Sequence, residues 1–228
     1  MTATVSCYPA SNEELSAIMY GGIVNTNYAT NYFNPTLLKE LGYTSAAAQV
    51  HSIPLYVVAS AFCLGVCYTS GKMNNRYIFL MFGVVLGSIG YIILLAQKAG
   101  VPIGARYMAL FFITSSGYIV QPMVVSWIMN NCSGHYKRAF TSGTMIGFGN
   151  AAGLIASNVF ITTEAPYYPV GYGTSLALLL NTGLFATLFL FLLKRENRKR
   201  DSGLRNDRLS LPNADNLGDD HPSFRFSM

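Results

Sequence analysis

The chain alternates long apolar stretches with short polar connections. Five stretches carry almost no charge: residues 53–69, 77–96, 107–128, 140–161 and 174–193. Each is about 17 to 22 residues long, and a helix of about 20 residues crosses a hydrocarbon core of about 30 Å. Because five such stretches follow one another without amphipathic helices to cover them, the pattern predicts an all-α membrane protein.

A sixth stretch, residues 15–33, has no charged residue but contains Asn25, Asn27 and Asn31. It is too polar to face lipid on all sides. We expect a sixth spanning helix that lines a hydrated cavity. A re-entrant or interfacial segment is the alternative.

These stretches predict one membrane domain between two polar ends. Residues 1–14 form an N-terminal cytoplasmic segment without Lys, Arg or an apolar run, so they are not a secretory signal. Residues 15–193 form a transmembrane six-helix bundle. Residues 194–228 are rich in Arg, Asp, Asn, Ser and Pro, with little to bury, so we expect a disordered basic cytoplasmic tail.

Charge supports this interpretation. Only 11% of the 228 residues are charged, where soluble domains have about 25%. Between residues 53 and 193 the charged residues are Lys72, Arg76, Lys98, Arg106, Lys137, Arg138 and Glu164. So few charges could not cover the surface of a soluble fold. The sequence therefore excludes an ordinary soluble domain and, despite a net charge of +5, a nucleic-acid binder.

The basic residues are sorted by side. Of the 15 Lys and Arg, three (Lys39, Lys98 and Arg106) lie in one set of connections, and the other twelve lie in the alternate connections and the tail. The positive-inside rule places the twelve in the cytoplasm, with both termini there if six helices span. With five spans the N-terminus would lie outside. We expect a multi-pass protein of the plasma membrane. A glycan on the sequon at Asn131 would overturn this orientation.

Signatures of enzymes are missing, since the chain has no Gly-rich phosphate loop, HExxH or GxSxG motif. We therefore predict no catalytic residues and no cofactor. We also predict no metal site, because Cys63 and Cys67 have no His, Asp or Glu beside them. Between Glu40 and Glu164 there is no acidic residue, so the spans lack the carboxylate that proton-coupled carriers usually bury.

Polar residues within the spans predict a hydrated cavity. They are Asn25, Asn27, Asn31, Tyr118, Gln121, Asn150, Asn158 and Asn181. Gly117, Gln121 and Pro122 together predict a local irregularity in the fourth span.

Small residues recur every four positions in the third and fifth spans, which places them on one face of each helix. They are Gly83, Gly87, Gly143, Gly147, Gly149, Gly153 and Ser157. Static helix packing and a sliding surface between moving bundles both fit this pattern.

Three motifs are more specific. Residues 127–138 read W-x-x-N-N-x-x-G-x-x-K-R, residues 149–157 read G-N-x-x-G-x-x-x-S, and residues 165–167 read A-P-Y. This combination resembles the major facilitator superfamily, in particular the anion:cation symporter branch of fungal allantoate and nicotinate permeases. Residues 33–56, with F-x-P-T, L-G-Y-T-S and I-P-x-Y, resemble the connection between helices seven and eight of that branch.

The resemblance covers about residues 33–194 and implies the C-terminal six-helix half of a twelve-helix carrier. It also implies that proton-coupling groups lie largely in the absent first half. One departure concerns the loop between helices eight and nine, where such carriers often have Asp-Lys/Arg-x-x-x-Arg. Here Gly71 stands in the place of the acid, which weakens a charge clamp used in gating.

Candidate site residues follow from the motifs and from polarity. Asn150 matches the Asn of the family pattern and is the first candidate for substrate contact. Polarity adds Tyr118, Gln121, Asn27 and Asn31. The resemblance assigns the predicted gate loops to Trp127, Asn130, Asn131, Gly134, Lys137, Arg138, Lys72 and Arg76.

The sequence thus predicts transport of a small organic anion of the carboxylate class, by proton symport with alternating access, as part of a complete carrier. The expected partners are the lipid bilayer, the anion, the proton, and a missing N-terminal half or another carrier chain. The alternative is a truncated, non-transporting membrane protein that assembles with other carriers. A membrane enzyme ranks third, for want of a nucleophile–base pair.

Overall fold

The computed structural model describes residues 11–40, 42, 44–154, 167–205, 218 and 221–227. This part of the chain is all helical, as predicted. Its elements are α1 (Ser11–Glu40), α2 (Ser45–Met73), α3 (Arg76–Leu95), the 3₁₀ turn η1 (Ala96–Ala99), α4 (Ile103–Asn131), α5 (His135–Ala151) and α7 (Pro169–Asp201).

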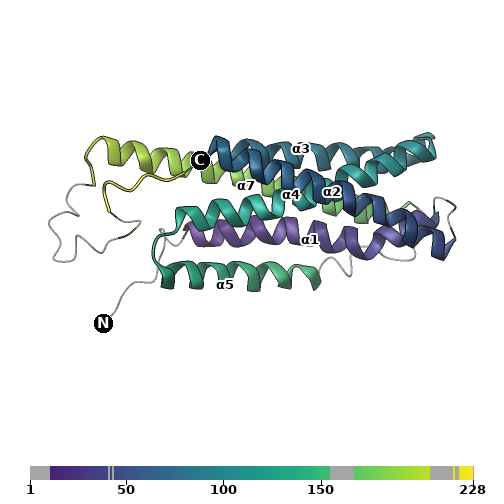
Figure 1. Cartoon of the computed structure of the whole chain (residues 1–228), viewed down its shortest axis with the longest axis horizontal. Coiled ribbons are helices and arrows are strands. Elements are labelled where there is room, and N and C mark those ends of the chain that lie inside the picture. Colours follow the sequence, from purple (N-terminus) through teal and green to yellow (C-terminus); the bar gives the residue numbers. More distant parts are fainter. Residues whose placement is uncertain are drawn as a thin grey trace.

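The helices lie side by side along the long axis of the molecule (Figure 1). The first helix, α1, packs against α2, α4, α5 and α7, whereas α3 packs mainly against α4 and α7. As a result α3 and α5 lie on opposite sides of the bundle (Figure 1).

Four helices in the described ranges are long and apolar enough to cross a membrane: α2, α3 together with η1, α4 and α7. Their presence supports a membrane protein. The polar side chains of α1 keep it outside this group, although its 30 residues would reach about 45 Å. The predicted span over residues 140–161 extends into residues 155–166, which lie outside the described residues. A complete six-helix half therefore stays a prediction.

Local sequence explains where several helices begin and end. The Thr44 side chain accepts a hydrogen bond from the backbone N–H of Ala47, which caps α2 at its N-terminus. Asn74, with φ of 49°, ends the same helix in the left-handed region. Gly134, with φ of 90°, provides the sharp turn between α4 and α5. Proline at the first position of α7 loses no hydrogen bond there.

The small residues of α3 make a close contact with α4. A Cβ on Gly83 would lie 2.6 Å from Cγ2 of Val120, and one on Gly87 would overlap the Ser116 hydroxyl. A Cβ on Gly90 would lie 2.8 Å from the backbone oxygen of Ala109. The glycines therefore let the two backbones approach closely, which favours helix packing for the small-residue pattern of the third predicted span.

The small residues of the fifth predicted span fall into two groups. Gly149 packs against the ring of Tyr20 and Gly153 against the ring of Tyr28, both from α1. A Cβ on Gly143 or Gly147 would meet no atom of the structure within 4 Å. Only half of this pattern therefore serves packing within the bundle, and Ser157 lies outside the described residues.

Helix α4 runs from Ile103 to Asn131 through Pro122 without interruption. The expected irregularity at Gly117, Gln121 and Pro122 is therefore not seen as a break. Proline removes one backbone hydrogen bond, and the neighbouring helices hold the rest of α4 in place.

The connection between α2 and α3 and the connection between α4 and α5 lie at the same end of the bundle. Near this end the guanidinium of Arg76, at the start of α3, lies against the side-chain amide of Asn130 near the end of α4, and it donates to the amide oxygen when the amide is oriented with that oxygen toward Arg76. At the opposite end Gln97 of η1 donates to the backbone oxygen of Tyr167 at 2.5 Å, and Lys98 lies over the ring of that tyrosine. The basic residues are thus divided between two ends, and which end faces the cytoplasm stays a prediction.

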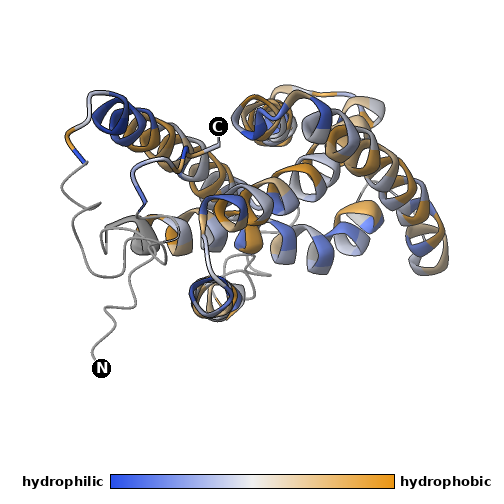
Figure 2. Cartoon of the chain, turned by 60° about the vertical axis from the view of Figure 1, so that its left-hand side comes forward, coloured by the Kyte–Doolittle hydropathy of each residue, from blue (hydrophilic) through white to orange (hydrophobic). Residues whose placement is uncertain are grey.

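The structure differs from the expected disordered tail in two places. Helix α7 continues to Asp201, well beyond the predicted span, and residues 221–227 pack against α4 and α7. Ion pairs hold the extension, because Glu196 contacts Arg200 at 3.5 Å and Arg205 at 2.9 Å. Figure 2 shows that α7 changes from hydrophobic along its length to hydrophilic at this C-terminal end.

Candidate functional site

A cluster of uncharged polar side chains joins α1 to α4 inside the bundle. Asn27 Nδ2 donates to Oε1 of Gln121 at 2.6 Å and to the backbone oxygen of Gly117 at 3.4 Å. Gln121 Nε2 in turn donates to the hydroxyl of Tyr20 at 3.2 Å. Two of the predicted substrate residues, Asn27 and Gln121, are therefore in direct contact.

Gly117 makes room for this cluster. A Cβ at this position would overlap Oδ1 of Asn27. The absence of a side chain on α4 thus lets the amide of Asn27 reach the backbone of the neighbouring helix. This gives Gly117 a role in positioning that polarity alone does not indicate.

A second polar contact joins α1 to α5. The Tyr28 hydroxyl donates to Oδ1 of Asn150 at 3.2 Å, at an exposed position. The ring of Tyr28 stacks on that of Tyr32, with centroids 6.0 Å apart, and its other neighbour is Gly153. Asn150 is the first candidate from the family pattern. It is therefore bound to α1 through Tyr28, the residue that follows Asn27.

The two remaining candidates lie near this cluster without joining its hydrogen bonds. Tyr118, one turn before Gln121 on α4, packs edge-on against Tyr56 of α2, with ring centroids 6.2 Å apart. Asn31 is exposed on α1, one turn beyond Asn27. The candidate substrate residues thus come from α1, α4 and α5, with α2 contributing Tyr56.

The cluster of Asn27, Gln121 and Tyr20 and the neighbouring pair of Tyr28 and Asn150, taken together as one candidate set, offer neutral hydrogen-bond donors and acceptors. Amide N–H and phenol O–H groups can donate to a carboxylate, and amide oxygens can accept from a hydroxyl or ammonium group. Within the described residues this set contains no charged side chain. Recognition here would therefore depend on hydrogen-bond geometry and on exclusion of water, rather than on an ion pair.

Sequence reasoning missed Tyr20 and Tyr28 as members of this set. A signal was available: Tyr20 precedes Asn27 by seven residues, which places both on one face of α1. Asn34 was missed too, although its side chain is buried and its Nδ2 donates to Thr114 Oγ1 at 3.4 Å. Thr114 lies seven residues before Gln121 on α4, so it shares the face of the cluster.

The predicted gate loops are mostly helical. Trp127, Asn130 and Asn131 belong to the last turns of α4, and Lys137 and Arg138 to the first turn of α5. Only residues 132–134 connect the two helices. Arg76 and Asn130, from two different predicted gate loops, contact each other through the guanidinium and the amide.

Trp127 and Asn131 bind the C-terminal segment, residues 221–227. The indole Nε1 of Trp127 donates to the Ser227 backbone oxygen at 3.0 Å, and the ring packs edge-on against Phe189. Asn131 accepts from the Ser227 backbone N–H at 2.7 Å and donates to its oxygen at 3.1 Å. Both side chains are fully buried. They are structural anchors in this conformation.

The other gate residues have simpler surroundings. Arg138 Nε donates to the backbone oxygen of Cys132 at 2.9 Å, which closes the turn made by Gly134. Lys72 lies 4.6 Å from the ring centroid of Tyr68, one turn earlier on α2. Lys137 is half-buried in the first turn of α5. Across the part of the chain that the structure describes, no group of three His, Cys, Asp or Glu side chains could hold a metal ion.

Comparison with known proteins identifies relatives. The chain is 36% identical over 214 residues to the MFS-type transporter cnsO of Penicillium expansum, covering 90% of this chain. It is 26% identical over 214 residues to the high-affinity nicotinic acid transporter of Saccharomyces cerevisiae. It is 30% identical over 179 residues to the major facilitator-type transporter hxnP of Emericella nidulans. No protein-family model matches the chain, and no solved structure matches it.

The chain spans about two fifths of the length of these relatives: 41% of cnsO, 40% of the nicotinic acid transporter and 35% of hxnP. All three are named as transporters, which agrees with a role other than catalysis. The helical bundle and its four apolar helices agree with these names, because membrane transporters of this kind are built from apolar helices. Together they support membership of this chain in the major facilitator superfamily of membrane transporters.

Proposed function

We propose that this chain forms the C-terminal half of a proton-coupled symporter for a small organic anion, of the carboxylate class to which nicotinate belongs. The observation that carries the proposal is the set of neutral polar side chains that α1, α4 and α5 bring together by hydrogen bonds within largely apolar stretches. Amide side chains within an apolar, membrane-spanning stretch are costly unless they serve packing or a ligand. A relative named for nicotinic acid supports the substrate class.

The neutral character of the cluster gives it a defined part in this function. It would orient a carboxylate by hydrogen bonds, while the positive charge that pairs with the anion would come from the other half of the carrier. The proton-coupling carboxylate would come from there as well, since residues 41–163 contain no acid. Alternating access would then bring the two halves together around the anion.

Uptake of radiolabelled nicotinate in transport-null cells tests this proposal. The chain is produced alone and together with the N-terminal half of a related nicotinate carrier. We expect uptake only when both halves are present, because one half cannot enclose a central site. Uptake that stays at background with both halves present and correctly inserted would contradict the proposal.

A second candidate is a non-transporting membrane protein that assembles with other carriers. The observation that favours it is the exposed apolar face of α2, whose most apolar stretch is only 11% buried in the bundle. This face carries Val50, Ile53, Val57, Leu64 and Tyr68. Co-purification with a carrier, without substrate binding by the chain itself, would favour this function over transport.

The proposed location is the plasma membrane, with the end of the bundle that carries Arg76, Asn130 and the end of α7 in the cytoplasm. The excess of basic residues at this end supports that orientation.

A further inference from the structure

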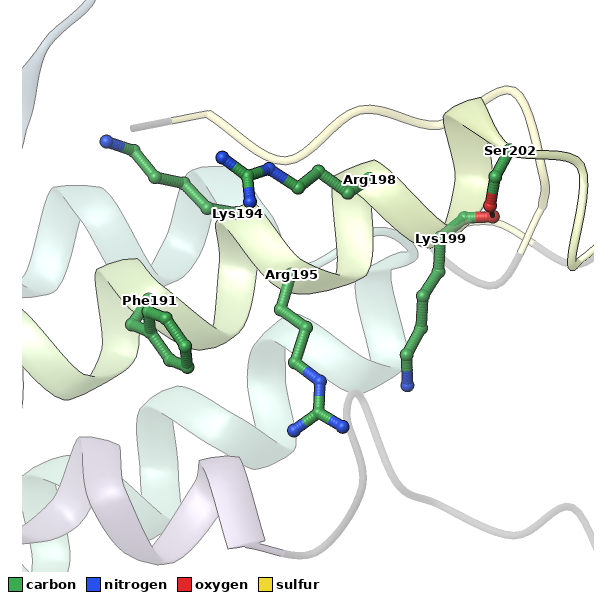
Figure 3. Close-up of a pocket in the computed structure, with 6 residues that line it drawn as sticks. All are labelled: Phe191, Lys194, Arg195, Arg198, Lys199 and Ser202. Atoms are coloured by element: carbon green, nitrogen blue, oxygen red, sulfur yellow. Dashed lines mark hydrogen bonds between the residues drawn. The ribbon is translucent and has the colours of Figure 1, made fainter.

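The last turns of α7 present a row of cations along one side of the helix. Lys194, Arg195, Arg198 and Lys199 follow Phe191 at spacings of three, four, seven and eight residues, which place them on one broad face. With Ser202 they line a hollow of about 480 Å³ (Figure 3). Arg195 and Lys199 extend from the same side of α7 as Phe191, and Lys194 and Arg198 from the adjoining side (Figure 3).

The acidic residues of this region are already engaged elsewhere. Glu196 receives two hydrogen bonds from Arg205, at 2.9 and 3.0 Å, and also contacts Arg200. Asp201 pairs with Arg225 at 2.9 Å. Among the residues described here, no carboxylate lies within salt-bridge distance of Lys194, Arg195 or Arg198. Lys194, Arg195 and Arg198 are therefore not paired with these acids.

The opposite face of α7 is held by the C-terminal segment. Asn197 donates to the backbone oxygen of Phe226 and accepts from its N–H, both at 3.0 Å. Arg200 donates to the backbone oxygen of Phe224 at 3.0 Å, and its guanidinium lies 4.3 Å from the ring centroid of Phe226. This face is covered, whereas Lys194, Arg195 and Arg198 are exposed and Lys199 is half-buried.

Such a face is suited to binding an anion. Lys194 and Arg198, like Arg195 and Lys199, are four residues apart, and like charges at this spacing destabilise a helix. A bound anion would relieve the repulsion. The hollow is walled by guanidinium and ammonium groups, which bind phosphate oxygens, and it has an apolar edge at Phe191.

The position of the face along α7 identifies the source of that anion. The apolar stretch ends at Leu193, and Phe191 is 63% exposed on the side of the cations. From Phe191 to Lys199 the helix rises about 12 Å, which starts at the edge of the hydrocarbon and crosses the headgroup region. Lys and Arg at such a depth lay their stems on lipid and extend their charges to the headgroups.

We propose that this face of α7 is a binding site for an anionic phospholipid, with Phe191 against the acyl chains and the four cations around the phosphate of the headgroup. The charge complementarity, the apolar edge and the depth in the bilayer all fit this one occupant. The site would be filled whether or not the chain transports, so it is independent of the proposed function.

Native mass spectrometry of the full chain in detergent, titrated with phosphatidylserine or phosphatidylcholine, tests this site. We expect bound phosphatidylserine in preference to phosphatidylcholine. Replacing Lys194 and Lys199 by glutamine should weaken phosphatidylserine binding about fivefold per cation. The matched control replaces Lys39 and Lys98, away from this site, and should leave binding unchanged.

A further arm distinguishes the lipid from a free anion. Inorganic phosphate at millimolar concentration should neither displace phosphatidylserine nor bind in its place. Equal retention of both lipids, equal binding by both double variants, or displacement by phosphate would each overturn the proposal. Circular dichroism of each variant confirms that loss of binding does not reflect loss of the helix.

Discussion

At the scale of single residues, Gly117 shows how a missing side chain shapes the site. Its backbone accepts from Asn27, whose amide oxygen occupies the place of a Cβ. The glycine therefore sets the distance between α1 and α4 at the point where Asn27 meets Gln121. Any side chain here pushes the two amides apart.

Gly117→Ala should therefore destabilise the chain by about 1–3 kcal/mol, the usual cost of overpacking. Gly143→Ala on α5 is the matched control. Its Cβ would meet open space, and alanine gains up to about 1 kcal/mol over glycine in a helix. Thermal unfolding in detergent measures both. Equal melting temperatures for the two variants would contradict the packing described for Gly117.

The substrate candidates make a different prediction. In the completed carrier, Asn27→Ala and Asn150→Ala should each raise the KM for nicotinate, because each removes one hydrogen-bonding group from the cluster. A single such group is worth about 0.5–1.5 kcal/mol, or about two- to tenfold. Gln49→Ala, exposed on α2, serves as the control. Unchanged KM values in both cluster variants would remove these residues from the substrate site.

At the scale of elements, the C-terminal segment links the ends of α4 and α7. It gives backbone partners to Asn131 of one helix and to Asn197 of the other. Together with Phe226, which is buried, these contacts hold two helices that have few direct contacts at this end. The segment therefore acts as a clasp between them.

Asn197→Ala should open this clasp. It removes two hydrogen bonds worth about 1 kcal/mol each, so the amide of Phe226 should exchange its hydrogen about 30-fold faster. Arg198→Ala is the control, because among the described residues this exposed side chain makes no hydrogen bond to the C-terminal segment. Hydrogen exchange followed by mass spectrometry measures the difference. Exchange at the wild-type rate in Asn197→Ala would show that the clasp does not depend on these bonds.

The helices also show which parts of the fold could be predicted from the sequence. Hydropathy alone predicted α2, α3, α4 and α7, because lipid demands a continuous apolar stretch from each helix that crosses it. The helical extension beyond Leu193 and the clasp were not predicted. They depend on contacts such as that between Asn131 and Ser227, 96 residues apart, which no local pattern reveals.

The candidate site also has a part that the sequence predicted and a part that it did not. Polarity found Asn27 and Gln121, because an amide within an apolar stretch is conspicuous. Polarity could not find the pairing of Tyr28 with Asn150, since tyrosines are common at membrane interfaces and carry no such signal. The role of Gly117 also depends on the approach of a second helix.

At the scale of the whole molecule, the contact of Arg76 with Asn130 brings two connections to one end of the bundle. The turn between α2 and α3 must therefore lie on the same side of the membrane as the turn between α4 and α5. The end of α7 lies there too, through Asn131 and the clasp. This arrangement holds whether or not α1 spans the membrane.

Cysteine labelling in intact cells can check it. In a cysteine-free background, Asn74→Cys and Tyr136→Cys, both exposed, should react with a membrane-impermeant maleimide from the same side. Lys98→Cys should react from the other side. Labelling of Asn74→Cys and Tyr136→Cys from different sides would contradict the bundle.

The burial of Asn131 also determines how the orientation can be measured. Its Nδ2, the atom that would carry a glycan, donates to the backbone oxygens of Trp127 and Ser227 at 2.9 and 3.1 Å. A sugar on this nitrogen would displace the clasp, so in the folded chain a bare Asn131 does not by itself report on which side of the membrane the sequon lies. A new sequon at exposed Asn74, made by changing Arg76 to Thr, lies outside the clasp; it gives up the contact of Arg76 with Asn130, and a glycan on Asn74 would place this end on the lumenal side.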